Sequence, residues 1–175
     1  MAIVDVPDGH PWNRLADPTW TDPIDATFAA IHGARWTPPG GPSTLYLNTD
    51  ETTARANLQR FLADAPFAPE DLNDANGYQL VPVALPDGQH ALDALTDGGL
   101  SDVGLPDTYP LDHDGAEIAH AACQPIGADA YDAGLDGVRC RSAAGISSEL
   151  AWFPRHQAAT PGPAQPFSDW YFEGS

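Results

Sequence analysis

Prolines limit what the first quarter of this chain can fold into. Residues 1–43, which are also rich in Asp and Trp, contain Pro11, Pro18, Pro23, Pro38, Pro39 and Pro42. A proline inside a helix removes a backbone hydrogen bond and clashes with the preceding turn, so a long helix cannot form in this segment. We therefore predict that residues 1–43 are mostly irregular.

The first regular pattern is a strand followed by a helix. Thr44–Asn48 combines β-branched and aromatic residues, which is typical of a strand. Residues 50–62 are predicted to form a helix that Thr49 or Asp50 can cap, because short polar side chains accept hydrogen bonds from the free amides of a first turn. The apolar residues of this helix fall on one face, at Ala54, Leu58, Phe61 and Leu62. Pro66 then prevents the helix from continuing.

Shorter patterns fill the rest of the chain. Strands are predicted at Gln79–Leu85, Gly137–Ser142 and Glu149–Phe153. The first of these contains Pro82, which suits an edge or a bulged strand. Short helices are predicted at Ala91–Leu95, Gly115–Cys123 and Gly127–Ala133, with a loop-rich crossing over Gly98–Asp114. The sum is an α+β fold with a broken sheet and short helices.

A length of 175 residues suits a single domain with a modest core. We assign residues 1–156 to this domain, including the irregular N-terminal segment, and residues 157–175 to a C-terminal tail rich in Pro and Gly. The tail ends in the aromatic cluster Phe167, Trp170, Tyr171 and Phe172. We expect this cluster to pack against the domain.

The charge of the chain excludes several kinds of partner. It has only 7 basic residues, all of them Arg, against 25 acids, and its formal net charge is −18. Nucleic acids and anionic membranes both require a basic surface, so neither is an expected partner. The sequence shows no secretory signal and no apolar run long enough to span a bilayer, so a cytoplasmic protein is expected.

The cysteines and histidines give no metal-binding pattern. Cys123 and Cys140 are expected to be reduced thiols, with a disulfide as the alternative. The 6 histidines are scattered and share no ligand spacing with them, so no metal is expected. The sequence leaves the oligomeric state open, a homo-oligomer included.

Arg35 stands out because it is an isolated cation in so acidic a chain. It lies in the run Gly33-Ala34-Arg35-Trp36-Thr37-Pro38-Pro39-Gly40. A guanidinium keeps its charge when partly buried and can bind a phosphate through two parallel hydrogen bonds. The alternative is that Arg35 only forms a salt bridge with one of the many carboxylates. The spacing alone does not choose between these two interpretations.

Four segments in chain order resemble the RES domain, a family named for its Arg, Glu and Ser. They are Trp12-Asn13-Arg14-Leu15-Ala16-Asp17-Pro18, the Gly33–Gly40 run, Leu45-Tyr46-Leu47, and Gly134-Leu135-Asp136-Gly137-Val138-Arg139-Cys140-Arg141-Ser142-Ala143. The resemblance runs from about Trp12 to Phe153 and covers most of the chain. The run with Arg35 and the strand that follows it are its most specific part.

This resemblance implies a fold related to the ADP-ribosyltransferase toxins, with NAD⁺ bound in a cleft as the substrate. RES proteins are typically toxins of bacterial toxin–antitoxin pairs that deplete NAD⁺ by phosphorolysis, with inorganic phosphate as co-substrate, or by hydrolysis. Some members transfer ADP-ribose to a protein. Their usual partner is a small helical antitoxin that blocks the active site.

With the resemblance, four side chains acquire expected roles. Cleavage of the nicotinamide–ribose bond passes through an oxocarbenium-like state, as in glycoside cleavage. Arg35 and Arg14 are candidates for binding the pyrophosphate or the incoming phosphate. Tyr46 is expected to stack on or hydrogen-bond the nicotinamide ribose, and Ser142 to donate a hydrogen bond to the ligand. The alternatives are a core aromatic residue for Tyr46 and a strand-end hydrogen bond for Ser142.

One position departs from the family pattern, because the expected Glu falls on Asn57. An acid near a developing cation is among the larger electrostatic contributions to catalysis. Asn57 can still orient the ribose in a working variant site, or another carboxylate can substitute for the missing acid. Glu149 ranks above Glu51 here, because Glu51 lies six residues before Asn57 and on a different helical face. The third outcome is a weakened module that binds NAD⁺ or an antitoxin and turns NAD⁺ over poorly.

Overall fold

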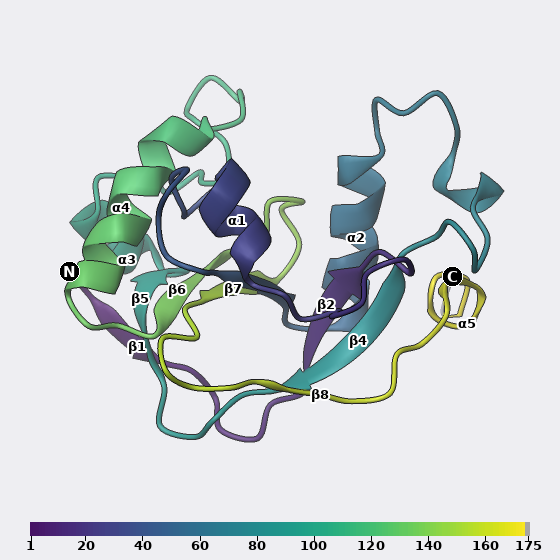
Figure 1. Ribbon diagram of the computed structural model, residues 1–175. Helices are drawn as coiled ribbons and strands as arrows, with labels where there is room; N and C mark the ends of the chain where they lie inside the picture. The colour runs from purple at the N-terminus through teal and green to yellow at the C-terminus, as the bar shows by residue number, and fades with distance from the viewer. Residues whose placement is uncertain (174–175) are drawn as a thin grey trace.

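A mixed sheet organises the protein, and helices stand against it (Figure 1). The computed structural model describes residues 1–173. In spatial order the strands of these residues are β1 (Ile3–Asp5), β5 (His90–Ala94), β6 (Gly137–Arg141), β7 (Ser148–Trp152), β3 (Leu45–Asn48), β2 (Trp12–Ala16), β4 (Gln79–Ala84) and β8 (Thr160–Pro161). The helices are α1 (Thr27–His32), α2 (Glu51–Phe61), α3 (Asp97–Asp102), α4 (His120–Asp132) and α5 (Phe167–Trp170), with a 3₁₀ turn at Pro69–Asp71.

The sheet is divided between β3 and β2. These two antiparallel strands share a single pair of partners, Asn13 and Asn48, whereas β2 pairs with β4 along its whole length. Only β5 and β6 run parallel among the paired strands of the described chain. The predicted α+β class and the predicted break in the sheet are both confirmed.

Alternation along β7 builds a core on each face of the sheet, because successive side chains of a strand point to opposite faces. Ala151 packs in a cluster with Trp36 and with residues of α3 and α4. Leu150 and Trp152 pack instead with Leu45, Leu47 and other strand residues on the opposite face. In the ladder between β3 and β7, Leu45 lies opposite Trp152 and Leu47 lies opposite Leu150. This pairing fixes the register of the central strands.

Helix α2 begins where the sequence predicts. The Asp50 side chain accepts a hydrogen bond from the Thr53 amide at 2.7 Å, so Asp50 rather than Thr49 is the N-cap. The helix buries Ala54 and Leu58 in a third cluster with Phe167 and Trp170 from the C-terminal segment. Arg55 on α2 also donates to the carbonyl oxygens of Trp170 and Tyr171. The segment from Phe167 to Tyr171 is therefore held against α2.

Residues 1–43 are mostly irregular, as predicted, although they also contain β1, β2 and α1. Three other local predictions are wrong. Ala91–Leu95, predicted as a helix, overlaps strand β5, whose pairing with β1 and β6 overrides the helix preference of its alanines. The two short helices predicted on either side of residue 125 form the continuous helix α4, which contains Pro125. Strand β4 is not an edge strand, because β8 covers it.

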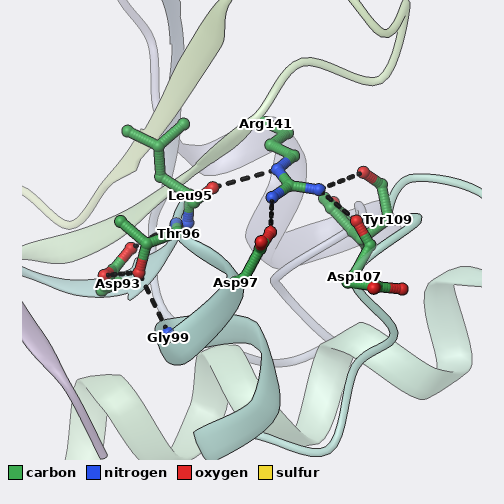
Figure 2. A network of polar contacts seen from close by, with 8 residues as sticks. All are labelled: Asp93, Leu95, Thr96, Asp97, Gly99, Asp107, Tyr109 and Arg141. Carbon is green, nitrogen blue, oxygen red and sulfur yellow. Dashed lines mark hydrogen bonds and ion pairs between the residues drawn. The ribbon is translucent and has the colours of Figure 1, made fainter.

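Figure 2 shows how the end of β6 is fixed. The Arg141 guanidinium donates to Leu95 O at 3.0 Å and pairs with Asp97 on α3 at 2.5 Å. It also donates to the carbonyl oxygens of Asp107 and Tyr109 in the following loop. These contacts hold the start of the 142–147 loop, which extends from β6 toward the site described next.

Candidate active site

A cavity of about 410 Å³ lies between α1 and α2, over strands β2, β3 and β7. In Figure 1 the two helices stand on the same side of the sheet. The cavity is lined by Arg14, Leu15, Trp20, Asp25, Phe28, Ala29, Ala34, Thr44, Tyr46, Asn57, Leu58, Arg60, Phe61, Tyr78, Ala143 and Glu149. The cavity lies over the junction between β2 and β3, where the two strands share a single pair of partners, because residues on both sides of this junction line it.

Arg14 is a buried cation that lines the cavity and has unused hydrogen-bonding capacity. Its Nη1 donates to Tyr46 O at 3.2 Å, and its guanidinium lies 5.6 Å from the ring of Trp20. Its Nε is buried and has no hydrogen-bond partner among residues 1–173. Burial lowers the pKa of Arg14 to about 10, although nearby Asp25 and Tyr46 act in the opposite direction. The side chain is therefore still charged at neutral pH and suited to an anion.

Arg35 lies behind the cavity and is not one of the residues that line it. Its side chain is 8% exposed, and its Nη2 pairs with Glu117 Oε1 at 2.6 Å. Its Nη1 donates to Ile118 O at 3.2 Å. The same Glu117 carboxylate pairs with Arg60 on α2, and Arg60 does line the cavity. Arg35 thus forms the salt bridge that the sequence allowed, and it does so at the border of the candidate site.

Tyr46 lines the cavity while its hydroxyl is engaged elsewhere. The hydroxyl accepts a hydrogen bond from the Trp36 amide at 2.9 Å and lies 3.4 Å from Thr37 Oγ1. Burial raises the pKa of Tyr46, so the phenol stays neutral. Of the two roles expected for this side chain, the geometry suits stacking better than hydrogen bonding to a ligand.

Asn57 is held by hydrogen bonds on both ends of its amide. Its Nδ2 donates to Asn48 Oδ1 and to Glu149 Oε1, each at 2.7 Å. Its Oδ1 accepts from Ser142 Oγ and from the Ala144 amide, each at 3.1 Å. Two donors and two acceptor positions are thus used, which fixes the side-chain orientation. Ser142 is fully buried, so it supports Asn57 from beneath and does not line the cavity.

Glu149 brings a carboxylate next to Asn57. It lines the cavity from β7, accepts from Asn57 Nδ2 through one oxygen, and accepts from the Ala143 amide at 2.7 Å through the other. Burial raises its pKa, while the Ala143 hydrogen bond and the charges of Arg35 and Arg60 oppose the shift. Glu51, the other candidate acid, pairs with Arg55 and does not line the cavity.

Two residues of this region were missed at the sequence level. Arg60 lies three residues after Asn57 on the same helix, so helical spacing would have placed both on one face. Glu117 and Arg35 are 82 residues apart in the chain, and no local sequence pattern predicts a contact between them.

The described residues show neither a metal cluster nor a membrane-spanning helix. Among residues 1–173, no group of three or more His, Cys, Asp or Glu side chains is arranged to hold a metal ion. No helix in that range is both long and apolar enough to cross a membrane. Cys123 and Cys140 are free and buried.

Comparison with known proteins places the chain in a family. No curated protein sequence matches it significantly. Its fold is similar to that of a chain in the crystal structure of the M. tuberculosis MbcT–MbcA toxin–antitoxin complex, with a TM-score of 0.75 and 18% sequence identity over 97% of this chain and 91% of that chain. The RES domain model matches residues 7–172, a wider span than the segments of resemblance in the sequence. The chain belongs to the RES domain family.

Proposed function

We propose that this protein is a RES-type toxin that consumes NAD⁺ by cleaving the nicotinamide–ribose bond, with phosphate or water as the acceptor. The observation that carries the proposal is one cavity lined by an underused cation, Arg14, an aromatic ring, Tyr46, and a fixed amide–carboxylate pair, Asn57 and Glu149. A dinucleotide offers a matching group for each of them. The proposal requires no metal.

The charges of the site suit the reaction. Arg14 binds the pyrophosphate, because its guanidinium has donors to spare and forms no direct salt bridge with a described side chain, although Asp25 acts on it through its charge. Tyr46 stacks on the nicotinamide riboside, and Asn57 orients Glu149. As the glycosidic bond breaks, positive charge grows on the ribose, and the Glu149 carboxylate stabilises it. The acceptor then attacks the ribose carbon that nicotinamide has left.

One assay tests the reaction and its acceptor. Purified protein is incubated with NAD⁺, with and without inorganic phosphate, and nicotinamide release is followed by chromatography. Release that depends on phosphate identifies phosphorolysis, and release without phosphate identifies hydrolysis. Labelled ADP-ribose on a protein band would instead identify a protein ADP-ribosyltransferase. NAD⁺ binding without release would leave a weakened binding module, and the absence of both would contradict the proposal.

Arg14→Ala is expected to raise the KM for NAD⁺ by about 10- to 100-fold, the loss typical of charge-assisted hydrogen bonds. Steady-state kinetics measure the effect. Arg155→Ala is the matched control, because Arg155 contacts Tyr131 and Leu135 and does not line the cavity. An unchanged KM in Arg14→Ala would contradict the role of Arg14.

The pH dependence of kcat/KM is expected to show an acid limb that belongs to Glu149. Only the ionised carboxylate stabilises a cation, and burial raises the pKa of Glu149. Activity is therefore retained above this raised pKa and lost as the pH falls through it, at a higher pH than for an ordinary glutamate. The limb should be absent from the residual activity of Glu149→Gln. An identical limb in that variant would assign it to another group.

We also propose a small helical antitoxin as the partner. The structural neighbour comes from a toxin–antitoxin complex. Around the cavity, the apolar residues Phe28, Phe61 and Trp20 are 57%, 68% and 39% exposed. Exposed apolar side chains gathered at one site suit a protein interface. Co-purification with the product of a neighbouring small gene tests this partner.

A further inference from the structure

Glu117 links two arginines that come from distant parts of the chain. Arg35 precedes Trp36 in the loop after α1, and Arg60 lies in the last turn of α2. The Glu117 carboxylate pairs with both through the same oxygen, Oε1. Because Arg60 lines the cavity, this shared oxygen marks a point at the cavity border where two guanidinium groups converge on one anionic atom.

The two arginines bind this carboxylate with different consequences. The Arg60 side chain is 38% exposed and Glu117 is 46% exposed, so their pair is weak and easily broken in water. The Arg35 side chain is 8% exposed, and a buried guanidinium left without an anion is costly. Glu117 is therefore free to leave only when another anion takes its place beside Arg35.

The backbone around Glu117 allows such an exchange. Glu117 is bridged to Leu111, and the Ile118 amide donates to Pro110 O at 3.1 Å, so the main chain is held in place. The hydrogen bond from Arg35 Nη1 to Ile118 O uses the backbone of this segment and does not involve the carboxylate. Rotation of the Glu117 side chain alone can then vacate the position between the two guanidinium groups.

We propose that Glu117 is an internal stand-in for a phosphate group: it occupies an anion subsite formed by Arg35 and Arg60 and is displaced when a phosphate-bearing ligand enters the cavity. This inference deepens the proposed function and rests on it for the identity of the natural ligand. A phosphate group has more acceptor oxygens than a carboxylate, and as a dianion it carries twice the charge. It can therefore bind the guanidinium groups of Arg35 and Arg60 at once.

The carboxylates of Glu117 and Glu149 both interact electrostatically with the two arginines of this subsite. Partial burial acts to raise the pKa of Glu117, but hydrogen bonds from Arg60 and Arg35 outweigh it and the pKa is lowered. The competing carboxylate is therefore ionised at neutral pH. The charges of both arginines also act to lower the pKa of Glu149. An anion bound between the two arginines is therefore coupled electrostatically to the proposed catalytic acid.

Glu117→Gln tests the proposal by isothermal titration of the full chain with inorganic phosphate and, separately, with NAD⁺. Removing the internal competitor is expected to tighten binding of at least one of these probes by about tenfold, equal to about 1.4 kcal/mol. Tightening for phosphate alone identifies a subsite for the acceptor, and tightening for NAD⁺ identifies a subsite for the pyrophosphate. Adding Arg60→Gln to Glu117→Gln should reverse the gain.

Glu51→Gln is the matched control. It removes a similarly exposed carboxylate that pairs with Arg55 at 2.6 Å and lies outside the cavity, so affinity for both probes should stay unchanged. Equal or weaker binding of both probes by Glu117→Gln would overturn the proposal. If that variant fails to fold, Glu117→Asp replaces it, because the shorter side chain cannot hold both arginines, and unchanged affinity there would also overturn it.

The binding readout separates this inference from the proposed reaction. If tighter phosphate binding is found in a protein that releases no nicotinamide, the subsite is supported and the proposed function fails. Nicotinamide release with unchanged affinities in Glu117→Gln would leave the reaction standing and overturn the subsite.

Discussion

Glu149→Gln is expected to lower the rate of nicotinamide release by about 100- to 1,000-fold, the range typical of losing one preorganised electrostatic contact to a transition state. The substitution removes the negative charge that faces the developing ribose cation and changes the side-chain volume very little. NAD⁺ affinity should change far less than the rate, because the charge acts mainly on the transition state. Single-turnover kinetics and titration with NAD⁺ measure the two effects separately.

The controls for Glu149→Gln address its structural contacts. The carboxylate accepts from Asn57 and from the Ala143 amide, and a glutamine retains only one acceptor oxygen. The lost hydrogen bond is worth about 1 kcal/mol of folding free energy, which thermal melts detect. Glu51→Gln should keep wild-type turnover. A Glu149→Gln variant that is folded and fully active would show that the acid lies elsewhere.

Asn57→Glu is expected to lower turnover by about 100-fold, although it introduces the residue type expected from the family pattern. Asn57 Nδ2 lies 2.7 Å from a Glu149 oxygen, so the new carboxylate would face the existing one. Two carboxylates at this distance cannot both stay ionised, and the pKa of one rises strongly. The variant would also lose the hydrogen bond that Asn57 donates to Asn48.

Steady-state assays of Asn57→Glu over a range of pH measure this effect. The proton shared by the two acids should move the acid limb of kcat/KM further toward neutral pH. Gln59→Glu is a suitable control, because it adds the same charge at an exposed position on the same helix. Faster turnover in Asn57→Glu would mean that the natural site is weakened and that Glu149 does not replace the missing acid.

Local signals made part of the fold predictable. The strand at Leu45–Asn48 and the helix at Glu51–Phe61 follow from side-chain pattern and from the Asp50 cap, which act within a few residues. Strand β2 could not be found in this way, because it contributes to the sheet through partners in β4 and β3. Strand β5 was missed for the same reason, since its alanines favour a helix until the neighbouring strands pair with it.

The candidate site likewise combines residues that the sequence identifies with contacts between distant residues that it does not. Arg14, Tyr46 and Asn57 were singled out from the sequence, and the structure brings all three to one cavity, while their roles stay predictions. The contact between Asn57 and Glu149 spans 92 residues, so the sequence could only rank Glu149 above Glu51. The sequence left Arg35 with two interpretations, a phosphate-binding residue or a salt-bridge residue. The structure shows a salt bridge to Glu117, a partner that no spacing rule could identify.

The most direct test of this account compares wild-type protein and Glu149→Gln for NAD⁺ binding and nicotinamide release under the same conditions. We predict that both proteins bind NAD⁺ and that only the wild type releases nicotinamide at an appreciable rate. Wild-type protein that neither binds NAD⁺ nor releases nicotinamide would contradict the assignment of the cavity between α1 and α2 as an NAD⁺-cleaving site.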